Sequence, residues 1–297
     1  MKIHLNLSQI PFNLDLTLQC GQVFRWKKID NWWYGVVRQK AVRAKQNGST
    51  LDFQTHPEEL DPGFWESYFR FDDDLPRIYS LINKDEYIKA AVEEFNGLRI
   101  LRQEPWECLI SYICATNKNI PAIKDMIQNI SRRFGEKLQF DGLEFYTFPK
   151  PIDLASASIR DLRECKLGFR AERVREASRR IATGELDLQA LRKLSYERVR
   201  VELMKLAGIG PKVADCILLF SFDKLEASPI DVWIKRIFME CYADYFEPSF
   251  VKMILGKKSL TRREYDRIQL FGKRYFGEFV GYAQEYLFHF KRCSLQR

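Results

Sequence analysis

The sequence predicts an α+β protein with an N-terminal antiparallel β-sheet domain, followed by two mainly helical subdomains that contain a helix-hairpin-helix. Apolar residues alternate along much of the range 2–56, which is the periodicity of strands with one buried face. After Leu60 the apolar spacing becomes helical, and a glycine-containing turn between two helical segments lies near residue 208. We place the sheet domain at residues 1–84, the helical domain at residues 85–297 and the helix-hairpin-helix at about 198–221.

The composition is that of a globular, basic chain. Its 297 residues are 46% hydrophobic, enough for a sizeable core, and the net charge of +8 favours an acidic polymer as partner. The seven cysteines are scattered and only three histidines are present, so the chain offers neither a disulfide framework nor a metal-ligand set. No signal peptide or membrane-length apolar run is found. We expect a soluble intracellular protein, in the cytoplasm, nucleoid or nucleus, that needs no cofactor or metal.

The N-terminal strands are predicted from apolar alternation at Ile3, Leu5 and Leu7 and again from Phe12 to Leu18. Turn signals such as Asn47-Gly48 separate the segments, and we expect about five or six strands. The stretch 20–26 is interpreted as one of them, with Gly21 at a strand edge or bulge.

The chain from residue 85 to residue 290 is predicted to be helical almost throughout. Asn117-Lys118-Asn119 indicates a turn between two helices, and Phe169-Arg170 precedes another helix. Phe169 taken alone is more typical of a core residue. Near the C-terminus, Gln284 and Phe288 are spaced to share one helical face.

The helix-hairpin-helix has the pattern Leu-x-Gly-x-Gly-x-x-x-Ala over residues 206–214, and Pro211 suits the first turn of its second helix. Gly208 and Gly210 permit close backbone approach, and the free N–H groups of a helix start suit a phosphate oxygen. The motif therefore predicts contact with a nucleic-acid backbone without sequence reading.

Two residues flanking the second helix suggest chemistry beyond binding. Lys212 lies in its first turn, where the helix dipole and burial favour the neutral amine, a nucleophile. Asp231 precedes the next helix and is expected to cap it, remain ionised, and stabilise a sugar cation or assist proton transfer. Cys216 follows Lys212 by one helical turn. Each residue also has an ordinary interpretation: a solvated or phosphate-contacting lysine, a helix cap and a core cysteine.

Residues 208–212 together with 229–232 resemble the helix-hairpin-helix DNA glycosylases. A lysine at position 212 is similar to that of the bifunctional members, which also nick the abasic strand. Further segments resemble the 8-oxoguanine DNA glycosylase family: Cys20–Trp26, the asparagine-containing turn at 117–119, the turn at 168–173, and the C-terminal Gln284 and Phe288. The matches extend from Gly21 to Phe288, nearly the whole chain.

The resemblance implies a role for each matching residue. Lys212 would attack C1′ of the damaged nucleotide and Asp231 would stabilise the cationic sugar. Gly21, Cys216, Gln284 and Phe288 would form the base pocket, in which the Gly21 carbonyl accepts a hydrogen bond from N7–H of the oxidised base. Contacts to the opposite base and the DNA backbone would come from Asn117, Phe169, Arg170, Gly208 and Gly210.

The sequence departs from the family pattern at three positions. Lys118 replaces an asparagine, Ala122 replaces an arginine that helps to read the partner cytosine, and Trp233 replaces a histidine that contacts a phosphate. Alanine offers no hydrogen bond to a base and a tryptophan ring carries no positive charge to hold a phosphate, so both contacts are in question.

The activity implied by the resemblance is excision of 8-oxoguanine from duplex DNA by base flipping and lysine Schiff-base chemistry, with strand cleavage by β-elimination. The partner would be double-stranded DNA containing 8-oxoguanine, bound by a monomer with no membrane association. Two alternatives remain open at this point: a glycosylase of the same fold for other damaged bases, and a non-catalytic DNA-binding protein that uses the helix-hairpin-helix only as a clamp.

Overall fold

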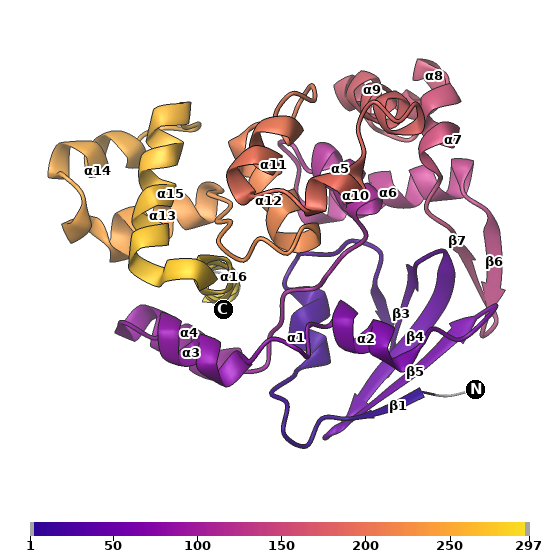
Figure 1. Ribbon diagram of the computed structural model, residues 1–297, viewed down its shortest axis with the longest axis horizontal. Coiled ribbons are helices and arrows are strands. Elements are labelled where there is room, and N and C mark those ends of the chain that lie inside the picture. The colour runs from indigo at the N-terminus through magenta and orange to yellow at the C-terminus, as the bar shows by residue number, and fades with distance from the viewer. Residues whose placement is uncertain (1–2, 295–297) are drawn as a thin grey trace.

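An antiparallel sheet lies at one end of the molecule and helices form the rest, as the computed structural model, which describes residues 3–294, shows in Figure 1. The sheet has five strands in the order β1-β5-β4-β3-β2. Their bounds are β1 Ile3–Asn6, β2 Lys27–Ile29, β3 Trp32–Val37, β4 Lys40–Asn47 and β5 Thr50–His56. The predicted α+β class is confirmed.

The helices fall into an N-terminal set and two larger groups. The N-terminal set is α1 Leu14–Gln19, α2 Pro62–Tyr68, α3 Leu75–Ile82 and α4 Glu86–Glu94. The next group runs from α5 Pro105–Cys114 and α6 Ile120–Phe134 through α7 Pro151–Ser156, α8 Ile159–Glu164, η1 Gly168–Arg170, α9 Ala171–Ala182, α10 Leu188–Arg192 and α11 Tyr196–Leu203 to α12 Pro211–Ser221. The last group is α13 Val232–Cys241, η2 Ala243–Tyr245, α14 Pro248–Leu255, α15 Arg262–Phe276, η3 Gly277–Phe279 and α16 Val280–Ser294.

Helices α1 and α2 complete the core on the sheet side of the molecule. Leu14 and Leu18 of α1 are buried with the strand residues, and Trp65 of α2 stacks on Phe53 of β5 with ring centroids 4.3 Å apart. Burial of such large aromatic side chains supplies much of the hydrophobic stabilisation of a small sheet. The predicted boundary at residue 84 lies between α3 and α4.

The strand predicted from Phe12 to Leu18 is wrong, because Leu14–Gln19 forms helix α1. Asn13 caps that helix by accepting a hydrogen bond from the Leu16 N–H, at 3.0 Å. Leu14 and Leu18 are spaced by one helical turn and both are buried. Apolar residues at alternate positions fit this short helix as well as a strand, and the N-cap decides between them.

The stretch 20–26 is not a strand either, since it forms an irregular connection between α1 and β2. Gly21 has a φ of +107°, a conformation that L side chains rarely adopt. The segment lies between the two cores: Cys20 and Phe24 join the helical core, whereas Val23 and Trp26 join the core on the sheet side. Gly21 is thereby placed next to the helices rather than within a ladder.

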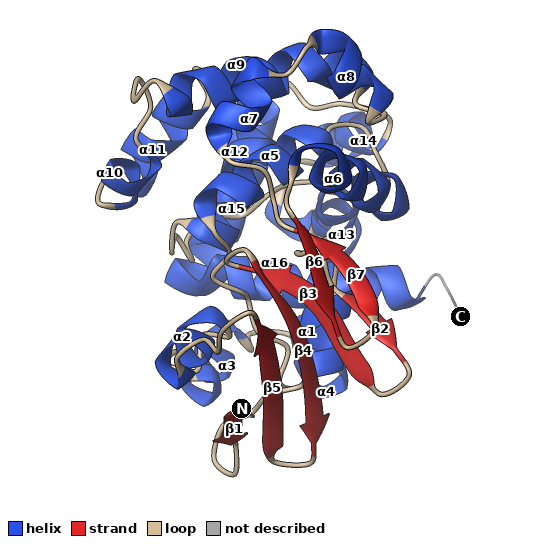
Figure 2. Ribbon diagram, turned by 90° about the vertical axis from the view of Figure 1, so that its right-hand side faces the viewer, coloured by secondary structure: helices blue, strands red, loops and turns tan. Residues whose placement is uncertain are grey.

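A second hairpin interrupts the region predicted to be helical. Strands β6 Lys137–Phe140 and β7 Leu143–Tyr146 pair through a turn at Asp141-Gly142, where both residues have positive φ. The Tyr34 hydroxyl donates to the Asp141 carboxylate at 2.5 Å, which ties the hairpin to β3. Figure 2 shows the hairpin extending along the face of the sheet from the helical side.

Helices α5 and α12 lie at the centre of the α5–α12 group, and nearly all their residues are buried. Helix α16 packs against α13, α4 and α3, on the other side of the molecule. The two helical groups and the 20–24 segment therefore meet where α12, α13 and α16 approach one another (Figure 1). No helix within residues 3–294 is both long and apolar enough to cross a membrane.

Candidate active site

The helix-hairpin-helix is formed as predicted, by α11, a turn and α12. Gly208 has a φ of +88°, and a Cβ there would collide with the Arg173 side chain, so this position requires glycine. Gly210 has ordinary extended dihedrals and caps α12, and Pro211 occupies the first turn. A Cβ at Gly210 would meet nothing within 4 Å, so its backbone faces open space.

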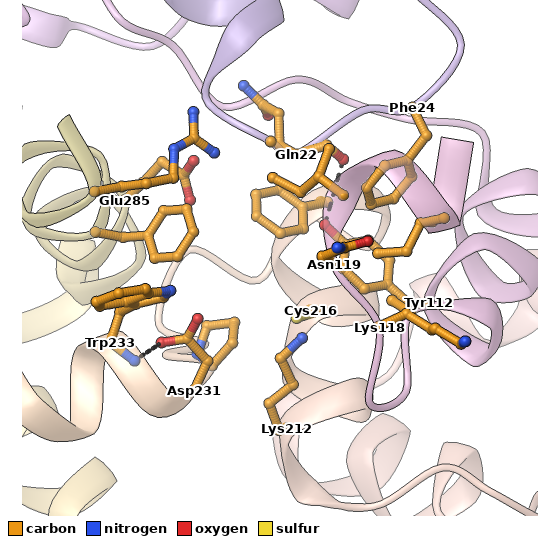
Figure 3. Close-up of a pocket in the computed structure, with 18 of the residues that line it drawn as sticks. Gln22, Phe24, Tyr112, Lys118, Asn119, Lys212, Cys216, Asp231, Trp233 and Glu285 are labelled. Carbon is orange, nitrogen blue, oxygen red and sulfur yellow. Dashed lines mark hydrogen bonds between the residues drawn. The ribbon is translucent and has the colours of Figure 1, made fainter. Parts of the chain in front are cut away.

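Lys212 lies in the first turn of α12, is partly buried, and lines a cavity of about 370 Å³. Its ammonium nitrogen lies 5.6 Å from the centroid of the Tyr112 ring, and Cys216 lies beside it on the same helical face (Figure 3). Burial acts to lower the pKa of Lys212, but Cys216 and Asp231 act to raise it, and the pKa is raised above its ordinary value. Burial also raises the pKa of the Cys216 thiol to about 12. This direction runs against the expected lowering of the lysine pKa, because Cys216 and Asp231 together outweigh burial.

Asp231 caps α13, as predicted. Its carboxylate accepts hydrogen bonds from the N–H groups of Trp233, at 2.9 Å, and Ile234, at 2.8 Å. Burial raises the pKa of Asp231, against the opposing effects of these N–H groups and of Lys212. Figure 3 shows Asp231 and Lys212 on opposite walls of the cavity, so a sugar held between them would face both.

The remaining predicted pocket residues line the same cavity. Gly21, Cys216, Gln284 and Phe288 all contribute to its wall, although they come from three distant parts of the chain. The side-chain oxygen of Gln284 is buried and has no hydrogen-bond partner among the described residues. An unpaired buried acceptor costs about 1–3 kcal/mol, so this atom is suited to a donor supplied by a ligand.

A buried network that the sequence did not reveal joins α12 to the loop before Asp231. Asp215 accepts hydrogen bonds from the Tyr196 and Tyr265 hydroxyls, both at 2.6 Å, and from the Gln269 amide at 2.7 Å. The Tyr265 oxygen in turn accepts from the Ile230 N–H at 3.1 Å. The sequence did offer one indication of this network, because Asp215 is the one charged residue within the apolar segment from Val213 to Phe222. The network fixes the separation between the helix that carries the lysine and the loop that carries the aspartate.

Comparisons with known proteins agree with this arrangement. Residues 4–109 match the family described as 8-oxoguanine DNA glycosylase, N-terminal domain, and residues 110–245 match the HhH-GPD superfamily of base excision DNA repair proteins. The probable N-glycosylase/DNA lyase of Methanothermobacter thermautotrophicus is 34% identical, over 95% of this chain and 94% of that protein. The chain belongs to the 8-oxoguanine DNA glycosylase family.

Other members of the family extend the likeness. The N-glycosylase/DNA lyase OGG1 of Arabidopsis thaliana is 30% identical, over 96% of this chain and 78% of that protein. The structure of Clostridium acetobutylicum 8-oxoguanine glycosylase/lyase in complex with double-stranded DNA containing cytosine opposite 8-oxoguanine has a TM-score of 0.85 and 32% identity, covering 99% of this chain and 98% of that one. The glycosylase/lyase architecture is therefore present along the whole described chain.

A second cavity, of about 610 Å³, adjoins the first. Its wall includes Asn117, Gly208 and Gly210, and it shares Lys212 and Asp231 with the first cavity. The turn at 117–119 lies between α5 and α6 as predicted, and Asn117 is exposed with a φ of +54°. The exposed backbone of the helix-hairpin-helix and Lys212 therefore line one continuous groove.

The residues predicted to contact the opposite strand differ in their exposure. Phe169 is 53% exposed, so it is not a core residue, and its ring lies beneath the guanidinium groups of Arg170 and Arg173. Arg170 is buried and donates hydrogen bonds to the backbone carbonyls of Leu167 and Thr116. The Phe169 ring is available to a base step, whereas Arg170 would have to exchange a backbone partner to reach a base.

The sequence-based interpretation missed other residues that line the first cavity. Tyr112 of α5 lies beside the lysine, and Glu285 and Arg292 of α16 lie near the 20–22 turn. All seven cysteines are free. No group of three or more His, Cys, Asp or Glu side chains that could hold a metal ion occurs in the part of the chain that the structure describes.

Proposed function

We propose that this protein excises 8-oxoguanine from duplex DNA through attack by Lys212 and then cleaves the abasic strand. The observation that carries the proposal is the joint placement of Lys212 and Asp231 on opposite walls of a cavity that also contains Gly21 and Gln284. An amine, a carboxylate and a base-sized recess are the groups that a glycosylase with lyase activity needs.

The cavity accounts for recognition of the base. Phe288 offers a ring for stacking and Gln284 offers both a donor and an acceptor to a Watson–Crick edge. The Gly21 carbonyl would accept from N7–H of 8-oxoguanine, whereas ordinary guanine presents a bare acceptor at N7 and would be repelled. A carbonyl at this point therefore favours the oxidised base, while alkylated purines and oxidised pyrimidines have no need of it.

The chemistry begins with loss of a proton from the Lys212 ammonium, since the neutral amine is the nucleophile. The amine nitrogen bonds to C1′ as the glycosidic bond breaks, and the electron pair leaves with the base, which is then protonated. Asp231 stabilises the positive charge that develops on the sugar. Ring opening gives a Schiff base, and removal of a C2′ proton expels the 3′ phosphate by β-elimination.

The helix-hairpin-helix holds the strand for this reaction. The free N–H groups at the start of α12 and the open backbone at Gly210 suit a phosphate oxygen next to the flipped nucleotide. Asn117 and Phe169 occupy the space that the extruded base leaves. We further propose that the protein acts as a monomer on double-stranded DNA, in the compartment that holds the genome.

The substrate assignment is tested with duplexes that carry one 8-oxoguanine, one 3-methyladenine or one oxidised pyrimidine at the same position. We expect release of free 8-oxoguanine, measured by mass spectrometry, followed by a strand nick. Release of the alkylated or pyrimidine base at an equal rate would overturn the choice of lesion, and binding without release would indicate a clamp.

A further inference from the structure

The turn that carries Gly21 is held in an unusual backbone conformation. Besides its φ of +107°, a Cβ at this position would lie 2.8 Å from the Ile120 side chain and 2.9 Å from the Arg292 guanidinium. No hydrogen bond to the Gly21 carbonyl is found within residues 3–294. The orientation of that carbonyl is therefore set by what holds its two neighbours, Cys20 and Gln22.

On one side, the C-terminal helix α16 holds the residues before Gly21 through their backbone. The two terminal nitrogens of Arg292 donate to the Cys20 carbonyl, at 2.7 Å, and to the Gln19 carbonyl, at 2.8 Å. Charged donors form stronger hydrogen bonds than neutral ones, and a planar guanidinium fixes two acceptors at once. The same guanidinium lies 5.6 Å from the centroid of the Phe288 ring. Arg292 thus connects the pocket phenylalanine to the turn.

A second residue of α16, Glu285, lies beside the same turn. The buried carboxyl of Glu285 contacts the Cys20 thiol, and the charge of Arg292 also acts on it. Burial raises the pKa of Glu285 to about 7, so a large fraction of this group is a neutral acid at physiological pH. Helix α16 therefore binds the Cys20 carbonyl through Arg292, while the Cys20 thiol donates to the Thr17 carbonyl at 3.4 Å.

On the other side of Gly21, the Gln22 side chain is fixed to the segment before α5. Its amide donates to the Arg99 carbonyl at 2.8 Å and accepts from the Leu101 N–H at 2.7 Å. The Gln22 carbonyl accepts from the Gln103 amide at 2.7 Å. Gly21 is thus held between two sets of contacts, and both Gln22 and Arg292 also line the base pocket.

We propose that Arg292 is a positioning residue for lesion recognition, which fixes the Cys20-Gly21 peptide so that the Gly21 carbonyl points at N7 of the flipped base. This inference rests on the proposed function and adds a specificity-determining residue to it. The two hydrogen bonds from Arg292 connect α16 to the end of α1. The packing of α16 therefore contributes to the discrimination between 8-oxoguanine and guanine.

The test compares Arg292→Met with Lys291→Met, which removes one positive charge from the neighbouring position of α16, where Lys291 pairs with Glu240 at 2.9 Å. Dissociation constants are measured for two duplexes that carry 2′-fluoro-8-oxodG or 2′-fluoro-dG at one position, which prevents cleavage. The ratio of interest is the Kd for the 2′-fluoro-dG duplex divided by the Kd for the 2′-fluoro-8-oxodG duplex. We expect this ratio to fall at least about tenfold in Arg292→Met, the effect of one lost recognition hydrogen bond, and to remain at its wild-type value in Lys291→Met. Arg292→Lys, which can reach one carbonyl, should give an intermediate ratio.

Lyase activity on a preformed abasic duplex serves as the second readout, since that reaction uses Lys212 without a base in the pocket. We expect Arg292→Met to retain it. An unchanged ratio in Arg292→Met overturns the proposal, as does an equal loss of affinity for both duplexes, which would identify Arg292 as a phosphate contact. If Arg292→Met also loses lyase activity, Arg292→Lys decides: an intermediate ratio supports the proposal and a wild-type ratio overturns it. Absence of any 8-oxoguanine preference in the wild-type protein would instead reject the proposed function.

Discussion

The substitution Gln284→Leu should move folding stability and lesion binding in opposite directions. In the protein without DNA, the Gln284 oxygen is buried with no partner among the described residues, which costs about 1–3 kcal/mol. Leucine has a similar size and no polar atom to leave unpaired, so the variant should unfold at an equal or higher denaturant concentration. In the complex the variant loses the hydrogen bonds to the base edge, which amounts to about 1–3 kcal/mol, or roughly 5- to 150-fold in Kd.

Urea unfolding gives the stability and fluorescence anisotropy gives the Kd for a duplex with uncleavable 8-oxoguanine. Gln128→Leu, on the exposed face of α6, is the same chemical change outside the cavity and should alter neither quantity. Binding of a duplex with an abasic site should be equal for wild type and Gln284→Leu, because no base occupies the pocket. Unchanged affinity of Gln284→Leu for the lesion, or a clear loss of stability, would refute the assigned role of this glutamine.

Three further predictions concern the carboxyl groups of Asp231 and Glu285 and the reading of the opposite strand. Asp231→Asn should fold normally, since asparagine also caps helices, yet lower the single-turnover excision rate by about 100-fold or more; a near wild-type rate would leave Asp231 as a helix cap only. Glu285 binds its proton more tightly in the folded state, so from about pH 4.5 to about pH 7 the wild-type free energy of unfolding should fall relative to Glu285→Gln, by about 3 kcal/mol in total; parallel pH profiles would contradict the burial of this acid. Excision opposite A, G or T should approach the rate opposite C in the wild type, because Ala122 reads no base and Arg170 is held by backbone carbonyls, and Ala122→Arg should raise the preference for C by roughly 5- to 150-fold. A strong native preference for C that Ala122→Arg leaves unchanged would show that other residues read the partner strand.

The sequence was sufficient where a motif determines its own local structure. The glycine turn at 208–210, the proline start of α12 and the capping aspartate at 231 all follow from backbone chemistry within a few residues. The β6–β7 hairpin was missed, although Asp141-Gly142 is a strong turn signal between two apolar segments.

The sequence was insufficient where tertiary contacts decide. The short helix α1 has the same apolar alternation as a strand, and only the Asn13 cap separates the two interpretations. The pKa of Lys212 is raised by Cys216 and Asp231, and how closely Asp231 approaches the lysine is fixed by no spacing in the chain. The hydrogen bond from Arg292 to the Cys20 carbonyl connects residues near opposite ends of the sequence, so no local pattern could reveal it.

Borohydride trapping followed by peptide mapping tests the central claim most directly. The protein is incubated with a duplex that carries one 8-oxoguanine, the Schiff base is reduced, and the cross-linked peptide is sequenced by mass spectrometry. The account predicts an adduct at Lys212 in the wild type, and in Lys212→Gln no adduct and no strand nick, with duplex binding retained through the backbone of the helix-hairpin-helix. An adduct at another residue, or undiminished trapping by Lys212→Gln, would contradict it.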